Sequence, residues 1–369
     1  MTNQSQPQSQ AQSQPGTAAQ ATLPRRQFIQ SGAGLAAAAA LPLAALSGGA
    51  HADTPPAAPA GPADLKRLVT EAHRRFAGEH AGKNADYIPY LASVPSQLFG
   101  IAIVDRHGGV ATAGDANTPF AIESIAKVFN LALVMAERGA DRVRDKLGAS
   151  ATGLPFNSVM ALELHGGKPL SPLVNAGAMA TVSFVAAASA TERWSKVFAN
   201  MKRFAGADLS LNAAVYQSEA ATNQHNRAIA YLLQSAGYMY SDPIEACDVY
   251  TKACSVNLTA RDLAMMGGVL ANNGVHPVSG TRLLDGRDVP KLLAEMAMEG
   301  MYDTSGDWLY DVGLPAKSGV GGGIVTVAPG RLAIAAFSPP LDTYGNSVRA
   351  QKAIAWIADQ LGLNVLRVA

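Results

Sequence analysis

The sequence has few cysteines and no excess of charge of either sign. Its two cysteines, Cys247 and Cys254, are too few for a disulfide framework. They share a segment with helical character, where their spacing corresponds to roughly 10 Å along a helix axis. A disulfide tolerates only about 7 Å between Cα atoms. We therefore expect both cysteines to be small, buried apolar residues.

The charge balance and the histidines exclude several classes of function. Lys and Arg number 29 against 28 Asp and Glu, so the net charge of +1 favours neither nucleic acid nor an anionic membrane. The 7 histidines are scattered, and none forms an HExxH motif or another close pair with metal-ligand spacing. We therefore expect no metal and no nucleic-acid partner. A hydrophobic content of 48% is enough for one large domain, or two intimate ones, with a well-buried core.

Residues 1–52 are predicted to be an export leader. Residues 1–22 are rich in Gln, Ser and Ala without an apolar period, which is typical of disorder. Arg25 and Arg26 then precede an alanine-rich stretch that is shorter than the ~20 residues of a membrane-spanning helix. Ala50-His51-Ala52 fits the small-residue rule for signal cleavage. This pattern predicts a twin-arginine signal cleaved near Ala52, hence an exported, periplasmic protein with no stable membrane span. The alternatives are an uncleaved anchor or a chance pair of arginines.

Strand patterns at both ends of the mature chain enclose a mostly helical middle. A Pro- and Ala-rich spacer over 53–63 precedes it. Two hairpins and two flanking helices are expected, with strands at 98–104, 110–113, 323–328 and 331–337 and helices at 63–75 and from about 346 onward. We predict an α/β (α+β) fold. It would have one antiparallel sheet drawn from about 64–120 and 312–369, beside a helical part at about 121–311.

Two polar residues in the predicted helical part are spaced for nucleophilic catalysis. Ser124 and Lys127 are three positions apart, which on a helix places both side chains on one face. A neutral amine can take the proton of a serine hydroxyl, and burial lowers the pKa of a lysine. A pKa near 7 would require on the order of 4–5 kcal/mol of differential environment. The ordinary alternative is a helix-start serine followed by a solvated lysine.

A second motif, Lys317-Ser318-Gly319, stands just before a predicted strand and is followed by Val320 and three glycines. A Lys-Ser/Thr-Gly strand opposite a Ser-x-x-Lys helix is the arrangement of β-lactamases and penicillin-binding proteins. Glycines there allow a ligand close to the backbone, so that an N–H group can point at a developing oxyanion. The two motifs together indicate serine acyl transfer. The alternative is an ordinary glycine-rich hairpin.

The chain resembles the serine-dependent glutaminases from about Ala85 to Leu363. The matching segments occur in family order: 120–129, 156–158, 175–178, 218–219, 250–255, 302–306, 317–323 and 345–347. The resemblance implies a β-lactamase-like fold and hydrolysis of the side-chain amide of L-glutamine to L-glutamate and ammonia through a glutamyl-serine intermediate. It also implies that neither metal nor organic cofactor is needed, and that the protein forms a homodimer or homotetramer.

The resemblance also carries the family's functional residues onto positions of this chain. It implies that Ser124 is acylated, that Lys127 is its base and that Tyr302 helps to move protons. The backbone N–H groups of Ser124 and Val320 would form the oxyanion hole. The remaining implied pocket residues are Tyr87 and the set that holds the α-groups of the amino acid, Asn175, Glu219, Asn226 and Tyr250. From the spacing alone, we expect Glu219 and Asn226 on one helical face, where a carboxylate suits an α-ammonium partner.

Three positions depart from the usual family pattern. Glu123, Ala126 and His225 stand where glutamine, serine and arginine are usual. Glu123 should touch the pocket, where an ionised carboxylate would repel the substrate's α-carboxylate by about 1–4 kcal/mol at ~4 Å. It could instead be protonated, or pair with Lys127. We expect activity with a weakened or altered substrate preference, and a lower KM for glutamine in Glu123→Gln.

Two rival functions remain open at this stage. One is a penicillin-recognising serine hydrolase, which uses the same two motifs. The other is a catalytically silent periplasmic binder of an amino acid, motivated by Glu123. Hydrolysis of a chromogenic cephalosporin would distinguish the first, and a ligand-dependent thermal shift without turnover would distinguish the second.

Overall fold

The structure of the protein is a computed structural model that describes residues 61–367. The described residues form one compact unit. The predicted leader over 1–52 and most of the 53–63 spacer therefore lie outside the described residues. Among residues 61–367, no helix has both the length and the apolar character that crossing a bilayer requires.

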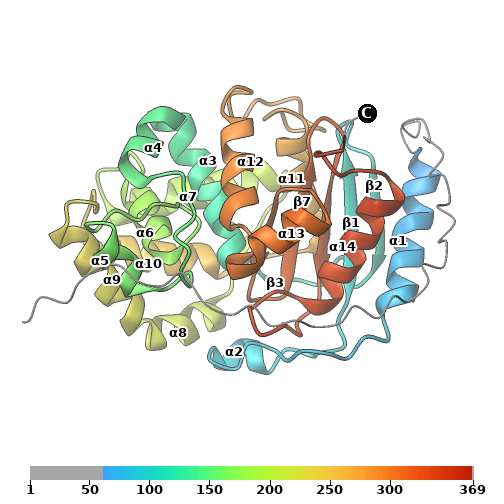
Figure 1. Ribbon diagram of the computed structural model, residues 1–369, viewed down its shortest axis with the longest axis horizontal. Helices are drawn as coiled ribbons and strands as arrows, with labels where there is room; N and C mark the ends of the chain where they lie inside the picture. Colours follow the sequence, from blue (N-terminus) through green and yellow to red (C-terminus); the bar gives the residue numbers. More distant parts are fainter. Residues whose placement is uncertain (1–60, 368–369) are drawn as a thin grey trace, which may run out of the picture. The chain divides into compact units, whose positions relative to one another are not determined.

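A five-stranded antiparallel sheet joins the two ends of the described chain (Figure 1). The strands lie in the order β2-β1-β8-β7-β6. The central pairing aligns Gly100 with Phe337 and Asp105 with Leu332. The bounds are β1 Gly100–Asp105, β2 Val110–Gly114, β6 Ala316–Gly319, β7 Gly323–Ala328 and β8 Leu332–Phe337. The predicted antiparallel sheet built from both chain ends is therefore confirmed.

Helices cover both faces of this sheet, so every residue of β7 and β8 is buried, and Thr326 is the one polar side chain among them. On one face, Ile103 and Ile334 pack in a cluster with helices α1 (Pro62–Phe76) and α14 (Val348–Gln360). On the other face, Val104 and Ala335 pack with helix α11 (Ala260–Ala271). Figure 1 shows α14 and α1 at the right, beside the strands.

Helix α11 comes from the middle of the chain yet packs against β1, β7 and β8. Thr259 begins it with a capping box, in which its hydroxyl accepts from the Asp262 backbone and Asp262 accepts from the Thr259 backbone. Gly267 permits the close approach to the sheet, because a Cβ there would meet Ala333 Cβ and Val325 Cγ2 at 2.8 Å. The middle of the chain therefore supplies a helix that covers one face of the sheet, in addition to the helices that lie beside the sheet.

Four of the remaining helices, α3, α4, α9 and α10, pack around the short helix α6, which is buried at every position. Its sequence is mostly Ala, Gly and other small residues, so neighbouring helices can approach closely. A Cβ on Gly177, for example, would lie 1.8 Å from the Ser171 carbonyl oxygen. The bounds of the helices not yet given are α2 Pro89–Ala92, α3 Ala126–Arg138, α4 Ala140–Leu147, α5 Val159–Leu164, α6 Asn175–Ser183, α7 Ala190–Ala205, α8 Ala213–Thr222, α9 Gln224–Ser235, α10 Pro243–Cys254, α12 Val289–Glu299 and α13 Ser305–Asp311.

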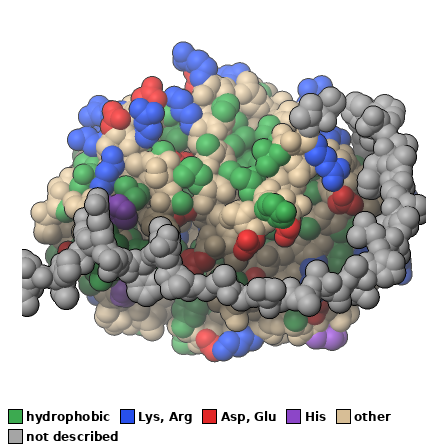
Figure 2. Space-filling view, viewed as in Figure 1, with side chains coloured by type: hydrophobic (Ala, Val, Ile, Leu, Met, Phe, Trp, Pro, Cys, Tyr) green, Lys and Arg blue, Asp and Glu red, His purple; other side chains and the backbone are tan. Residues whose placement is uncertain are grey.

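Short elements connect these helices to the sheet. Two 3₁₀ turns, η1 (Glu123–Ile125) and η2 (Tyr302–Thr304), precede α3 and α13. A small antiparallel sheet has the order β3-β5-β4, with bounds Phe120–Ala121, Val256–Leu258 and Ser210–Leu211. Cys247 and Cys254 both lie in α10, buried and unbridged, as the sequence predicts. Figure 2 shows acidic, basic and apolar side chains interspersed over one face of the molecule, in keeping with the balanced charge.

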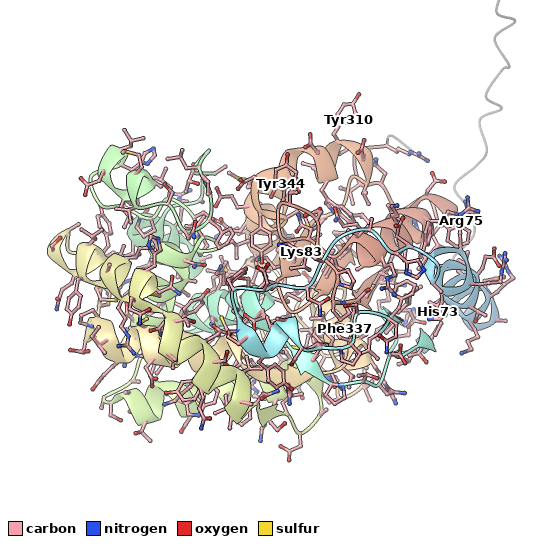
Figure 3. All side chains as sticks on the ribbon, turned by 90° about the horizontal axis from the view of Figure 1, so that it is seen from below. His73, Arg75, Lys83, Tyr310, Phe337 and Tyr344 are labelled. Atoms are coloured by element: carbon pink, nitrogen blue, oxygen red, sulfur yellow. The ribbon has the colours of Figure 1, made fainter. Side chains whose placement is uncertain are left out.

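We predict that Phe337→Ala lowers the free energy of unfolding by about 3–5 kcal/mol, because it removes a fully buried ring and leaves a cavity. The Phe337 ring stacks on Phe120 with a centroid separation of 4.2 Å. Tyr310→Ala is the matched control, since Tyr310 is 88% exposed and should shift stability by no more than about 0.5 kcal/mol. Figure 3 labels both residues, with Tyr310 pointing away from the protein. Urea unfolding measures the difference, and similar losses in the two variants would contradict this account of the core.

Candidate active site

A serine and a lysine meet where η1 passes into α3. Ser124 lies in the 3₁₀ turn and Lys127 in the first turn of the helix. The Lys127 Nζ donates to Ser124 Oγ at 3.0 Å, and both residues are buried. The predicted proximity of these two side chains is confirmed. A hydroxyl held this close to an amine is positioned to lose its proton to that amine.

The surroundings of Lys127 favour its uncharged form. Besides Ser124 Oγ, its amine donates to Asn175 Oδ1 at 2.8 Å, so both acceptors are neutral oxygens. Burial lowers its pKa from 10.5 to about 8, although Cys254 and Glu299 act in the opposite direction. Within residues 61–367, no carboxylate forms an ion pair with Lys127, so the pairing with Glu123 that the sequence left open does not occur.

Asn175 connects the lysine to two further predicted pocket residues. Its Oδ1 also accepts from the Tyr250 hydroxyl at 3.3 Å, and its Nδ2 donates to Asn226 Oδ1 at 3.1 Å. Asn175 is the first residue of α6, and its backbone N–H donates to the Phe156 carbonyl at 2.8 Å. The amide plane is thus fixed by contacts on both sides. Asn175, Asn226 and Tyr250 lie together as predicted, and their roles stay predictions.

Tyr302 lies on the other side of the serine, in η2. Its hydroxyl is buried and faces the Ser124 side chain, but makes no hydrogen bond of good geometry among the described residues. Its ring lies 4.9 Å from that of Phe156 between centroids and 4.4 Å from the Lys317 Nζ. Burial raises the pKa of Tyr302 well above its usual range, so the phenol keeps its proton. An unengaged phenolic O–H beside a nucleophile can donate to a leaving group or hold a water.

The backbone is strained at two residues of this site. Glu123 has φ 51° and Tyr302 has φ 55°, both in the left-handed region that residues with a Cβ seldom adopt. Such strain is of order 1–3 kcal/mol per residue and persists only where the surroundings impose it. The two residues flank Ser124, in sequence and in space respectively. The sequence contained no signal for either conformation.

The end of edge strand β6 forms the wall opposite Ser124, because β6 packs directly on η1. Two glycines allow this contact. A Cβ on Gly319 would lie 2.7 Å from the Ile122 carbonyl oxygen, and one on Gly321 would lie 2.4 Å from the Ala121 carbonyl oxygen. The glycines that follow Lys317 therefore serve close backbone packing. The predicted placement of the 317–320 segment across from Ser124 and Lys127 is confirmed.

Lys317 and Val320 have different places on this wall. Burial holds the pKa of Lys317 well below its usual range, and its Nζ donates to the carbonyls of Gly300 (3.1 Å) and Ser318 (2.7 Å). Val320 lies just past the strand and lines the adjoining cavity. Among the described residues, no group accepts from the backbone N–H of Val320 or of Ser124. Both donors can therefore serve an oxygen of a bound ligand.

A cavity of about 420 Å³, a size typical of small-molecule sites, adjoins these groups and is lined by Asn175, Asn226 and Val320, although not by Ser124 or Lys127. Tyr87, which is 58% exposed, lines this cavity together with Lys83 and Tyr344, the two lining residues that Figure 3 labels. The side chains that line the cavity are largely polar or aromatic. They include Asn84, Asp86, Tyr87, Phe156, Asn157, Asn175, Asn223, His225, Asn226, Val320 and Tyr344.

The prediction that Glu219 and Asn226 share one helical face is wrong. Helix α8 ends at Thr222 and α9 begins at Gln224, because Asn223 leaves helical geometry with ψ 23°. The seven-residue spacing therefore spans a break, and the two side chains belong to consecutive helices. Asn226 reaches Asn175, whereas Glu219 reaches a different group of side chains.

Glu219 lies beside Glu123 and Cys254, with the terminal atoms of all three within 4.8 Å of one another. Glu123 is 3% exposed, and its Oε1 has no partner among the described residues. Burial, and then the proximity of Glu219, raises the pKa of Glu123 well above its usual range. Within residues 61–367, this is the one group of three side chains spaced to hold a metal ion. The sequence expectation that no metal is needed stays a prediction.

Sequence reasoning missed two contributors to the site. Phe156 packs on Tyr302 and lines the cavity, and Cys254 completes the acidic group. Both belong to segments that resemble the family, and that was the available signal. Neither has a side chain whose chemistry would single it out in a sequence.

Comparison with known proteins places this site in a family. A family model described as Glutaminase matches residues 82–366. A glutaminase of Brucella canis is 62% identical over 284 residues, covering 77% of this chain and 90% of its own. One from Mycobacterium ulcerans is 56% identical over 306 residues, covering 83% and 96%. One from Bordetella avium is 59% identical over 305 residues, covering 82% and 98%.

Solved structures give the same result. A probable glutaminase, ybaS, superposes with a TM-score of 0.81 at 56% identity, covering 82% of this chain and 98% of its own. A Bacillus glutaminase superposes with a TM-score of 0.74 at 31% identity, covering 83% and 99%. The predicted fold class is confirmed by these likenesses together with the antiparallel sheet.

Proposed function

The chain belongs to the glutaminase family, and on that premise we propose that it hydrolyses L-glutamine to L-glutamate and ammonia through an ester on Ser124. The observation that carries the proposal is the 3.0 Å contact between Ser124 Oγ and the buried amine of Lys127, beside a cavity of small-molecule size. A serine with an adjacent uncharged amine is equipped for acyl transfer, and the curated relatives named above are glutaminases.

In the first half-reaction, neutral Lys127 takes the Ser124 proton as Oγ attacks the amide carbon of the substrate. The oxyanion that forms accepts hydrogen bonds from the backbone N–H groups of Ser124 and Val320, which have no other acceptor among the described residues. As the carbon–nitrogen bond breaks, the nitrogen receives the proton that Lys127 took from Ser124, either directly or relayed through the Tyr302 phenol, and leaves as ammonia.

In the second half-reaction, water attacks the glutamyl ester and Lys127 accepts its proton. The ester bond then breaks, Ser124 recovers its proton, and glutamate is released. The substrate's α-groups are held by residues that line the cavity or adjoin it, namely Tyr87, Asn175, Glu219, Asn226 and Tyr250. Glu219 supplies the carboxylate for the α-ammonium group.

The two rival functions have less support. A penicillin-recognising hydrolase would share the serine, the lysine and the β6 strand, but the family model and the curated relatives named above are glutaminases. A silent amino-acid binder would require a disabled base. The contact of Lys127 with Ser124 and its lowered pKa favour a working one.

We further propose that the mature protein is periplasmic after twin-arginine export and forms a homodimer or homotetramer. The export proposal is supported by Arg25-Arg26 ahead of an alanine-rich stretch and by the small residues at Ala50 and Ala52. The proposal of an oligomer is supported by the family resemblance.

Ser124→Ala should abolish ammonia release from glutamine, because no other group can form the ester. Ser195→Ala is the control, since that serine is exposed on α7 and bonds only the Thr191 carbonyl. A coupled ammonia assay against glutamine, asparagine and a chromogenic cephalosporin measures both variants and the wild type. Wild-type turnover of the cephalosporin without ammonia release from glutamine would instead favour the penicillin-recognising rival.

The rate at saturating glutamine should rise with pH and level off above about 8. Burial lowers the pKa of Lys127 to about 8, so the base is protonated below that pH and free above it. The expected slope is about tenfold per pH unit on the acid side. Steady-state kcat between pH 6 and 10 tests this, and Lys127→Arg, which keeps its proton throughout, should be inactive. A flat profile, or one that falls through pH 8, would refute Lys127 as the base.

Replacing both Arg25 and Arg26 by lysine should keep the protein in the cytoplasm, because twin-arginine signals are read through these side chains. Cell fractionation and the N-terminal sequence of the periplasmic product measure the outcome, with cleavage expected near Ala52. Replacing Arg67 by lysine, in helix α1, provides the matched control. Unchanged periplasmic yield in the double variant would contradict twin-arginine export.

A further inference from the structure

We propose that Glu123 works as an uncharged carboxylic acid that donates its proton to the Glu219 carboxylate, and that this singly charged pair recognises the α-ammonium group of glutamine. Glu123 is then a specificity-determining residue. The inference rests on the proposed function, because it concerns the same site.

The geometry of the two carboxyl groups requires a proton between them. Their terminal atoms lie within 4.8 Å of each other and of Cys254 Sγ. Oε1 of each glutamate is buried and has no other hydrogen-bond partner among the described residues, so a proton shared between the two carboxyl groups would satisfy both. Two carboxylates at such a distance, away from water, do not both ionise. The pair therefore titrates as a unit and holds one proton over the neutral pH range.

The enclosure of Glu123 prevents it from escaping this contact. Gly319 and Gly321 lie against its aliphatic part. A Cβ on Gly319 would lie 3.3 Å from Glu123 Cβ, and a Cβ on Gly321 would lie 3.2 Å from Glu123 Cγ. The residue is 3% exposed and its backbone is held at φ 51°. The carboxyl group therefore cannot turn toward bulk water to be solvated as an anion.

The groups that face Glu123 supply no permanent positive charge. They are Lys127 from α3, Glu219 from α8, Cys254 from α10, Tyr302 from η2 and Tyr87 from the loop before α2. Lys127 is the single potential cation, and it has to be neutral to act as the base. An ionised Glu123 would hold the proton on Lys127, so a neutral Glu123 is also compatible with catalysis.

Glu123 keeps the proton because it is the more deeply buried member. Glu219 as a residue is partly exposed, although burial of its carboxyl group raises its pKa to about 7. The contact raises the pKa of Glu123 and opposes the effect of burial on that of Glu219, as expected for a donor and its acceptor. Glu219 is then the anion that meets the α-ammonium.

This arrangement gives Glu123 the same role that an amide would have, with one difference. A glutamine at 123 could also donate to Glu219 and would add no charge near the α-carboxylate of the substrate. The carboxylic acid, however, can lose its proton at alkaline pH. The pair then carries a second negative charge that repels the α-carboxylate. Glutamine affinity should therefore fall at high pH in this chain and not in Glu123→Gln.

Infrared difference spectroscopy can observe the proton directly. The wild-type minus Glu123→Gln spectrum at pH 7 should contain a protonated-carboxyl stretching band that disappears as the pH is raised. Glu295→Gln is the matched control, since burial also raises the pKa of Glu295, to about 8, but the residue lies outside the site. Its difference spectrum should show a separate band. Chelator in all samples keeps divalent cations from taking the place of the proton.

Kinetics tests the consequence for the substrate. At pH 7, Glu123→Gln should not show the lower KM for glutamine that the sequence predicts for an ionised Glu123, whereas Glu123→Leu, which cannot donate to Glu219, should raise KM. At pH 9.5 the wild-type KM should exceed that of Glu123→Gln by roughly fivefold or more, as expected for a second charge near the α-carboxylate. The substrate's own amino group titrates equally with every variant and cancels in this ratio.

A missing protonated-carboxyl band, or a large drop in KM for Glu123→Gln at pH 7, would show that Glu123 is ionised and would overturn the inference. If Glu123→Gln does not fold, the pH titration of the wild-type band together with Glu123→Leu decides the matter. The infrared result does not depend on turnover. A wild-type protein that carries the band but releases no ammonia would refute the proposed function and leave the pair intact.

Discussion

The burial of an amine without a counter-charge is the constraint on which this site depends. Lys127 is enclosed by α3, α6 and the neighbouring helices, and its two hydrogen bonds go to neutral oxygens. A carboxylate in direct contact would keep its proton in place and remove the base. Glu123 and Glu219 accordingly lie close to the amine without forming an ion pair with it.

The rest of the scaffold keeps that arrangement closed. The edge strand β6 reaches η1 because glycines replace side chains at the contact, and α6 brings Asn175 to the lysine because its small residues allow tight packing. Left-handed backbone at Glu123 and Tyr302 then directs these side chains toward Ser124 and its surroundings. The packing of the sheet and helices thus stabilises the unfavourable backbone conformations of Glu123 and Tyr302.

Local patterns allowed much of the fold to be predicted from the sequence. Apolar periodicity and turn residues placed both hairpins, the first helix and the final helix within a few residues of their observed bounds. The spacing of Ser124 and Lys127 was equally informative, because a helical turn fixes the distance between such neighbours. These features depend on interactions within a few residues along the chain.

Two features could not be predicted, a local break between two helices and a contact between residues far apart in sequence. The spacing of Glu219 and Asn226 suggested one helix, but Asn223 ends α8 through a local geometry that periodicity does not reveal. The environment of Glu123 could not be predicted for a different reason. Its neighbours Glu219 and Cys254 come from α8 and α10, and nothing near Glu123 in the sequence reports them.

The pairing of β1 with β8 has a consequence for biosynthesis. These two strands form the middle of the sheet and come from opposite ends of the described chain, so the ribosome must release nearly all of it before the sheet can close. Loop closure over such a separation is entropically costly and slow. The helical segment between them includes α11, whose apolar face cannot pack on the sheet until β1 and β8 have paired. A chain cut short before β8 would expose this face, and proteases and chaperones could recognise the incomplete product by it.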